Sequence, residues 1–341
     1  MNHLPPALAL LLGAACASGP VLDTSQDLVW SQAVEGDLDV FARVKGQQRR
    51  LTTTPGSDFA GPVSPDGRTV LVLHSNDQDE AHQESLWAVS LDGLTTTPVA
   101  GPSTKLRNPR WLPDGSVVYE SDAQSFRDLY RAVPGQPPTR LTASPHGCFE
   151  PAVSAAGGVA GGAPDAVVHV CSGADPDLWT VPSTGGTHRV LLQRTGEDIA
   201  PAVALDGTVA WLASEKGRLG VWAMAADGTG AHPVWTSPDP AAQVVPEQGL
   251  HWSPDGARLA LVVRDGDGVA GVRVLRMPSG KLALSITGEL PDWTAGGALL
   301  FTHEDAAGLG VFRLDDPGGA VRLTAPGGWL GRGIPRGGAQ R

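Results

Sequence analysis

The stretch Trp252-Ser253-Pro254-Asp255-Gly256 decides the fold of this chain. In such a turn proline presets φ, the aspartate side chain bonds the nearby backbone, and glycine takes the positive φ. Related segments recur at 61–67, 109–115, 151–157, 201–207 and 291–297. The residues expected to shape these repeats are Asp66, Gly67, Trp111, Asp114, Gly115, Asp206, Gly207, Trp252, Pro254, Asp255, Gly256 and Trp293. Recurrence at a regular spacing indicates a repeat architecture.

Apolar runs follow each of these turns. The first run is short, as in residues 259–263, and the second ends in an aliphatic residue beside an aromatic one, as in Leu178-Trp179. A last segment such as Thr139-Arg140-Leu141-Thr142 closes each unit. Each unit is therefore predicted to be four short strands in about 45 residues. No stretch sustains the 3.6-residue period of an amphipathic helix.

This pattern resembles the TolB-type and WD-repeat-like β-propeller family, whose recurring strand ends in Trp-Ser-Pro-Asp-Gly. The resemblance implies an all-β propeller of four-stranded antiparallel blades. Residues 28–30, 38–44 and 49–52 would be strands two to four of a unit that lacks its first strand. The tail at 329–334 could supply that strand, so that N- and C-terminal strands pair and close the ring. Seven blades are favoured and six are the alternative.

Composition narrows the class of protein. Apolar residues make up 41% of the 341 residues, which is enough to form a core and excludes wholesale disorder. The 44 glycines and 29 prolines disfavour long helices. A net charge of −11 without a basic patch argues against a nucleic-acid partner. We expect one propeller domain over residues 27–335 and a flexible tail at 336–341.

The N-terminus predicts export. Residues 1–16 carry no acidic side chain, lysine or arginine, and the apolar run at 7–17 is too short to span a bilayer. The segment Gly13-Ala14-Ala15-Cys16 resembles the lipobox of bacterial lipoproteins. That resemblance implies a signal peptide at 1–15, a lipid on Cys16 that anchors the chain at the periplasmic face of the outer membrane, and a linker at 16–26. A plain signal peptide, giving a secreted or periplasmic protein, and a chain that is not exported are the alternatives.

The other two cysteines flank a predicted hairpin. Residues 148–153 run in and residues 166–171 run out, so Cys148 would face Cys171 across an antiparallel pair. Opposed residues in such a pair are close enough for a disulfide. A bridge here would stabilise the fold by about 3 kcal/mol, whereas the alternative is two buried thiols.

The sequence contains no recognised catalytic motif, and no cofactor is predicted. One acidic loop offers His74, Asp77, Asp79 and His82, side-chain types that can hold zinc, manganese or calcium. A solvated loop between strands is the favoured interpretation of this segment. The remaining histidines scatter along the repeats and do not predict a metal centre on the axis of the ring.

These observations favour a binding or scaffolding module without catalysis. Its partner would be a protein or peptide, or a glycan, docking on a propeller face or at the central funnel. The membrane would be reached only through the N-terminal lipid. A metal-dependent polysaccharide lyase or hydrolase on a propeller scaffold is the alternative, and a purely structural envelope protein is a third hypothesis.

Overall fold

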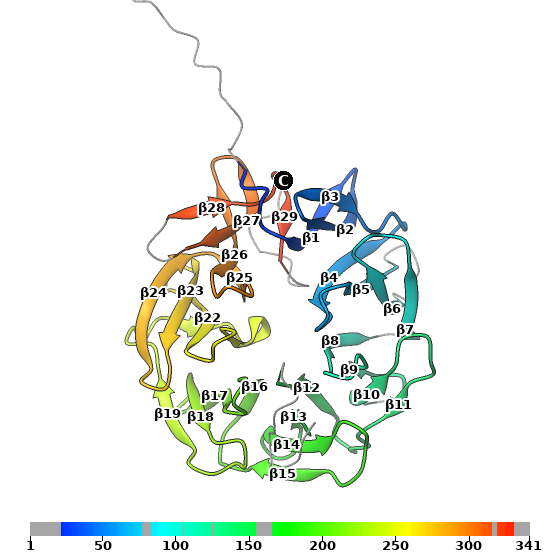
Figure 1. The fold of residues 1–341 in the computed structure, drawn as a ribbon. Helices are drawn as coiled ribbons and strands as arrows, with labels where there is room; N and C mark the ends of the chain where they lie inside the picture. The colour runs from blue at the N-terminus through cyan, green and yellow to red at the C-terminus, as the bar shows by residue number, and fades with distance from the viewer. Residues whose placement is uncertain are drawn as a thin grey trace, which may run out of the picture.

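The computed structural model describes residues 22–76, 83–103, 105–124, 126–154, 166–315 and 319–330. Short sheets stand radially around a ring (Figure 1). The described residues form 29 strands and one 3-10 turn, η1 (Pro246–Gln248). No helix in this part of the chain has both the length and the apolar character that a membrane crossing requires.

One sheet has eight strands in the order β29-β1-β2-β4-β5-β6-β7, with β3 paired to β2. Its strands are β1 (Leu28–Val34), β2 (Asp37–Val44), β3 (Gln47–Arg50), β4 (Ser57–Val63), β5 (Thr69–Ser75), β6 (Glu84–Ser90), β7 (Thr96–Ser103) and β29 (Gly328–Trp329).

Five further sheets follow in chain order. Four of them have four strands each. The first contains β8 (Leu106–Trp111), β9 (Val117–Ser121), β10 (Asp128–Ala132) and β11 (Thr139–Arg140), the second contains β12 (Cys148–Ala152), β13 (Ala166–Cys171), β14 (Asp177–Pro182) and β15 (Arg189–Leu192), and the third contains β16 (Asp198–Val203), β17 (Val209–Glu215), β18 (Arg218–Met224) and β19 (His232–Trp235). A five-stranded sheet contains β20 (Gln243–Val244), β21 (His251–Trp252), β22 (Arg258–Arg264), β23 (Ala270–Arg276) and β24 (Lys281–Thr287). The last comprises β25 (Glu289–Trp293), β26 (Leu299–Asp305), β27 (Gly308–Leu314) and β28 (Ala320–Arg322).

The four-stranded antiparallel blade is confirmed, but the predicted number of blades is wrong. Among the described residues, five sheets stand alone as blades, rather than seven or six. The cause lies in the eight-stranded sheet. A single parallel pair, Leu38 with Ser57, bridges β2 to β4 and joins the strands of the first two predicted units.

The two ends of the described chain meet in this eight-stranded sheet. β29 pairs antiparallel with β1, with Ser31 opposite Trp329 and Gln32 opposite Gly328. The tail therefore supplies a strand beside β1, as the sequence predicts. The pairing covers an edge of β1 that would otherwise be open to other chains.

The core lies between neighbouring sheets rather than within one of them. The second strand of each unit is apolar on both faces, and in β13 every residue is buried. Val168 and Val170 of β13 pack in one cluster with Val209 and Trp211 of β17. Continuous apolar runs at these positions are expected because each such strand is covered on both sides.

Candidate functional site

A β-bulge interrupts the innermost strand of four of the blades. The register shifts between residues 107 and 110, 149 and 152, 199 and 202, and 289 and 292. In each bulge one residue adopts a positive φ and a proline follows it: Asn108 (47°), Glu150 (55°), Ala200 (51°) and Leu290 (52°). Proline has no N–H to donate to the ladder, so pairing breaks at this step. The bulge turns the next side chains away from the regular strand alternation.

Side chains bridge the bulged backbones of successive blades. The carboxylate of Glu120, 1% exposed, accepts hydrogen bonds from Asn108 Nδ2 at 2.6 Å and from the Glu150 N–H at 2.7 Å. Oε2 of Glu150 in turn accepts a bond from the Ala200 N–H at 2.7 Å. Gln248 Oε1 accepts the Leu290 N–H at the same distance. The contacts to Glu150, Ala200 and Leu290 satisfy backbone N–H groups in the bulges.

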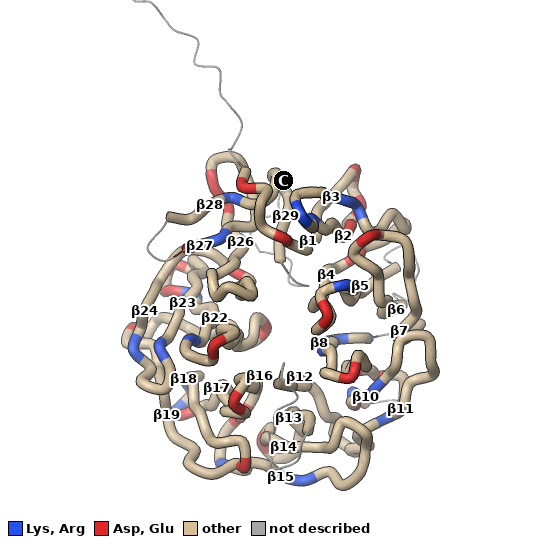
Figure 2. Tube along the Cα trace, viewed as in Figure 1, with Lys and Arg blue, Asp and Glu red and all other residues tan. Residues whose placement is uncertain are grey.

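Charged side chains of both signs gather where the innermost strands approach one another. Arg110 of β8 lies close enough to Glu120, Glu150 and Asp292 for electrostatic interaction, and His251 interacts with Arg110 and Asp292. We name Arg110, Glu150, His251 and Asp292 the axial cluster. Figure 1 places β8, β12 and β25 along the inner edge of the ring, and Figure 2 shows charges of both signs there.

The axial cluster is accessible and incompletely neutralised. Arg110 and Asp292 are exposed, whereas Glu150 and His251 are half-buried. Within the described residues, neither Arg110 nor Asp292 forms an ion pair. Burial raises the pKa of Glu150, and the neighbouring Glu120 raises it further, although the Ala200 N–H opposes this. Burial lowers the pKa of His251, which keeps that imidazole neutral near pH 7.

The repeated tryptophans connect neighbouring units. The indole N–H groups of Trp111, Trp252 and Trp293 donate to backbone carbonyls of Pro62, Ala202 and His251, at 2.9, 3.2 and 3.0 Å. Each acceptor lies between 42 and 50 residues earlier in the chain. One side chain type therefore makes the same contact at three interfaces.

The predicted turn residues lie in turns. Asp66, Asp114, Asp206 and Asp255 each accept the backbone N–H two residues ahead through Oδ1. The four following glycines have positive φ: Gly67 (71°), Gly115 (79°), Gly207 (88°) and Gly256 (68°). Pro254 precedes Asp255 in the turn closed by the Gly256 N–H bond to the Ser253 carbonyl.

Of the four residues of the acidic loop that could hold a metal, only His74 falls within the described residues, and Asp77, Asp79 and His82 lie outside them. His74 Nδ1 lies 2.8 Å from Asp58 Oδ1, across the β4–β5 pair. Asp58 is 2% exposed, and burial raises its pKa while the His74 contact lowers it. The predicted signal peptide and the predicted lipidation site, Cys16, also lie outside the described residues.

The predicted disulfide between Cys148 and Cys171 is confirmed. The two cysteines are register partners on β12 and β13, with Cα atoms 4.1 Å apart. The register further along differs from the prediction: Ala152 faces Val168, so the expected pairing of residues 153 and 166 is lost. The bulge at Glu150 causes this shift, because one strand contains extra residues there.

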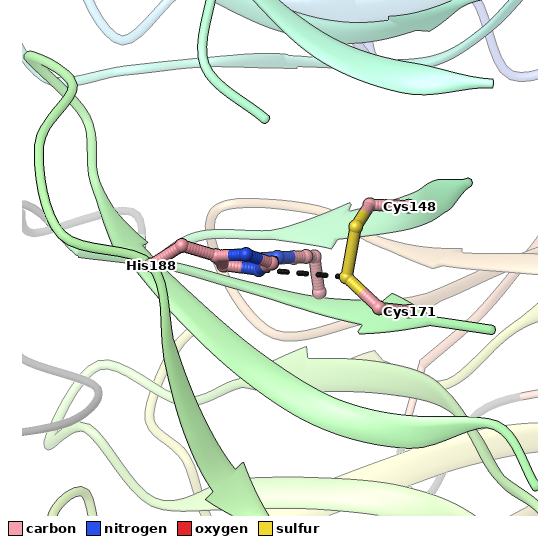
Figure 3. A group of neighbouring side chains, drawn as sticks. Cys148, Cys171 and His188 are labelled. Carbon is pink, nitrogen blue, oxygen red and sulfur yellow. Dashed lines mark hydrogen bonds between the residues drawn. A yellow bond between two sulfur atoms is a disulfide. The ribbon is translucent and has the colours of Figure 1, made fainter. Parts of the chain in front are cut away.

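Two histidines complete a cluster that the sequence did not predict. His169 Nε2 lies 2.7 Å from His188 Nε2, and that nitrogen lies 3.4 Å from Cys171 Sγ. Figure 3 shows the imidazole of His188 beside the disulfide. Burial and the nearby His188 lower the pKa of His169 to about 3, so the imidazole is neutral. We name Cys148, His169, Cys171 and His188 the Cys–His cluster.

Strand alternation could have revealed half of this cluster. His169 precedes Cys171 by two residues on one strand, so both side chains point to the same face. His188 gives no such signal, because it precedes β15 and its position depends on the path of the β14–β15 connection.

Comparisons with known proteins agree with the geometry. The family described as the lipoprotein LpqB β-propeller domain matches residues 146–295. No curated protein matches the chain. A putative TolB from Agrobacterium tumefaciens is similar in structure, with 18% identity over 79% of this chain and 94% of that chain, and a TM-score of 0.56.

Two enzymes have similar folds. The oligogalacturonate lyase of Vibrio parahaemolyticus is 12% identical over 88% of this chain and 85% of its own, with a TM-score of 0.59. A puromycin-hydrolyzing peptidase of Mycobacterium tuberculosis is 14% identical over 90% of this chain and 55% of its own, also at 0.59. At these identities the similarity establishes the fold alone. The chain is therefore a β-propeller whose fold is similar to that of TolB, and its residues 146–295 match the LpqB propeller domain.

Proposed function

We propose that this propeller is an exported, non-catalytic binding module whose partner docks over the axial cluster. The accessible charges of Arg110 and Asp292 carry the proposal. They belong to blades far apart in sequence, yet they interact electrostatically. A rigid ring holds both charges in place before the partner arrives, which reduces the entropy lost on binding.

A protein or peptide segment suits the axial cluster better than a glycan does. Arg110 offers a forked donor for a carboxylate, and Asp292 offers an acceptor for a lysine or arginine. A peptide segment can supply both charges, whereas a neutral glycan supplies neither.

The experiment is photo-cross-linking in living cells, followed by recovery of the cross-linked proteins from the membrane fraction. A photoreactive residue replaces Glu247, an exposed residue beside Gln248, whose carbonyl contacts His251 of the axial cluster. Leu94, 83% exposed, carries the same probe as the matched control. We expect one or a few proteins to be captured at position 247 and not at position 94. Arg110→Glu should reduce that capture at least tenfold. Equal capture at both positions, or capture that Arg110→Glu leaves unchanged, would contradict the proposal.

We propose further that Cys16 carries a lipid and that residues 1–15 are its signal peptide. A disulfide is typical of exported proteins, and the matched propeller family is named for a lipoprotein. The proposal includes attachment at the periplasmic face of the outer membrane. Cys16→Ser should abolish labelling by a fatty-acid analogue and move the protein to the soluble fraction. Unchanged labelling would reject Cys16 as the anchor.

The alternative is a metal-dependent lyase or hydrolase, and the fold similarity to the Vibrio lyase favours it. This hypothesis requires a bound metal and turnover. Elemental analysis of the purified protein and an ultraviolet assay for unsaturated products from oligogalacturonate test it. Metal-dependent product formation would replace the binding proposal with the enzymatic one.

A further inference from the structure

The Cys–His cluster occupies a position that differs from its counterparts in other units. Where second and third strands pair, an aromatic residue usually faces another, as in Trp30–Phe41, Tyr119–Tyr130, Trp211–Trp222 and Phe301–Phe312. These rings contact one another with centroids between 5.7 and 6.1 Å apart. In the β12–β15 blade His169 faces Trp179 instead, and His188 contacts both rings.

The four side chains of this cluster bring two sulfur and two imidazole donors together. One ligand atom from each lies within 4.8 Å of all the others. Two cysteines and two histidines are a donor set that holds zinc in tetrahedral geometry. Zn–S and Zn–N bonds of about 2.3 and 2.0 Å would require the two sulfurs about 3.8 Å apart and the two nitrogens about 3.3 Å apart.

The imidazoles are oriented for ligation. His169 Nδ1 lies 3.2 Å from the Val167 carbonyl and donates its proton there. Its Nε2 is then an acceptor, so the 2.7 Å contact requires His188 Nε2 to donate. A ligating histidine commonly donates its second N–H to a backbone carbonyl, which fixes the ring and leaves the other nitrogen free for the metal.

We propose that this cluster becomes a zinc-class metal site when the Cys148–Cys171 disulfide is reduced. A dithiol reductant supplies two electrons and two protons, breaks the S–S bond, and is itself oxidised to a disulfide. The divalent cation then binds the two sulfurs and displaces both thiol protons. His188 gives up its donated N–H by shifting that proton to Nδ1, so two protons leave for each metal bound.

Oxidation reverses the sequence. The metal leaves, the two thiolates transfer two electrons to the oxidant, and the disulfide forms again. The chain would thus hold its β12–β13 pair together in either state, through a covalent bond or through a metal. The site goes beyond partner binding at the axial cluster, because it lies on other residues.

Cobalt and zinc titrations of the full chain test this proposal. After reduction by a phosphine, Co²⁺ should bind at one equivalent and give the sulfur-to-cobalt charge-transfer absorption of a thiolate site. The oxidised protein should give no such band. His188→Ala should weaken Zn²⁺ binding at least about tenfold, because it removes one ligand. The control His232→Ala changes an exposed histidine whose Nδ1 contacts only the Gly230 carbonyl among the described residues.

Stability measurements exclude an unfolded sample as the explanation. Reduction should lower the melting temperature, and one equivalent of Zn²⁺ should restore part of the loss, because a ligand of the folded state stabilises that state. The proposal fails if the reduced, folded protein binds no Co²⁺. It also fails if zinc affinity is insensitive to His188→Ala, or if reduction unfolds the chain and zinc does not refold it.

Discussion

The indole N–H of Trp111 joins two sheets through a single atom. It donates to the Pro62 carbonyl at 2.9 Å, while the ring packs with the apolar cluster around Leu106. Trp111→Phe retains most of the packing and leaves that carbonyl without its partner. We expect a loss of about 1–2 kcal/mol in the free energy of unfolding, measured by urea denaturation. The control Trp235→Phe changes an indole nitrogen without a hydrogen-bond partner among the described residues and should cost less.

The carboxyl of Glu150 makes stability depend on pH. Burial raises its pKa above the ordinary value of 4.5. At a pH between the ordinary and the raised pKa, the folded chain therefore holds a proton that the unfolded chain has released. Stability contributed by this group is therefore present at low pH and lost as pH rises through the raised pKa. The free energy of unfolding of the wild type, relative to Glu150→Gln, should fall as the pH rises above the ordinary carboxyl pKa of 4.5.

Urea denaturation of both proteins across this range measures the effect. A carboxyl whose pKa is shifted in the opposite direction provides the control. The side-chain and backbone hydrogen bonds of Thr229 lower the pKa of Asp227. Relative to Asp227→Asn, wild-type stability should therefore rise with pH below about pH 4. A flat difference for Glu150→Gln would show that its carboxyl titrates alike in both states.

At the scale of the strand, the bulge predicts unequal losses of stability when two nearby alanines of β16 are replaced by glycine. Ala200 and Ala202 are 6% and 8% exposed, but only Ala200 has a positive φ, of 51°. A left-handed conformation costs an alanine about 1–2 kcal/mol, and glycine escapes that cost. Ala200→Gly should therefore be about 1–2 kcal/mol less destabilising than Ala202→Gly in chemical denaturation. Equal losses at the two positions would contradict the assigned role of the bulge.

The sequence predicts strands and turns well because their signals are local. Proline, aspartate and glycine in Trp252-Ser253-Pro254-Asp255-Gly256 act on the residues beside them. The same logic places Cys148 opposite Cys171, since the hairpin register can be counted. The bulge at Glu150 could not be predicted, because a residue followed by proline does not by itself show that a strand contains extra residues at that point. The contact between His188 and His169 could not be predicted either, because it depends on the path of the β14–β15 connection, which has no sequence periodicity.

At the scale of the whole ring, the number of separate sheets depends on a single hydrogen-bonded contact. Leu38 and Ser57 are joined by a parallel bridge that no repeat pattern encodes. Ring closure is easier to predict, because the first unit lacks its first strand and the C-terminal tail is available to supply one. The axial cluster depends on the closed ring, since Arg110 and Asp292 come within electrostatic range of one another only when the ring brings β8 and β25 toward one centre.

Ring closure can be tested by shortening the chain. A chain ending at residue 326 loses β29 with Trp329 and Leu330, which are 5% and 6% exposed. It also loses the bond from the Leu330 N–H to Thr302 Oγ1 at 3.0 Å. Removing one such large core side chain costs roughly 3–5 kcal/mol, and the uncovered edge of β1 can pair with other chains. We expect a lower melting temperature and aggregation in light scattering, whereas a chain ending at residue 335 keeps β29 and should match the full chain. Equal stability of both truncations would mean that the ring holds without its terminal strand.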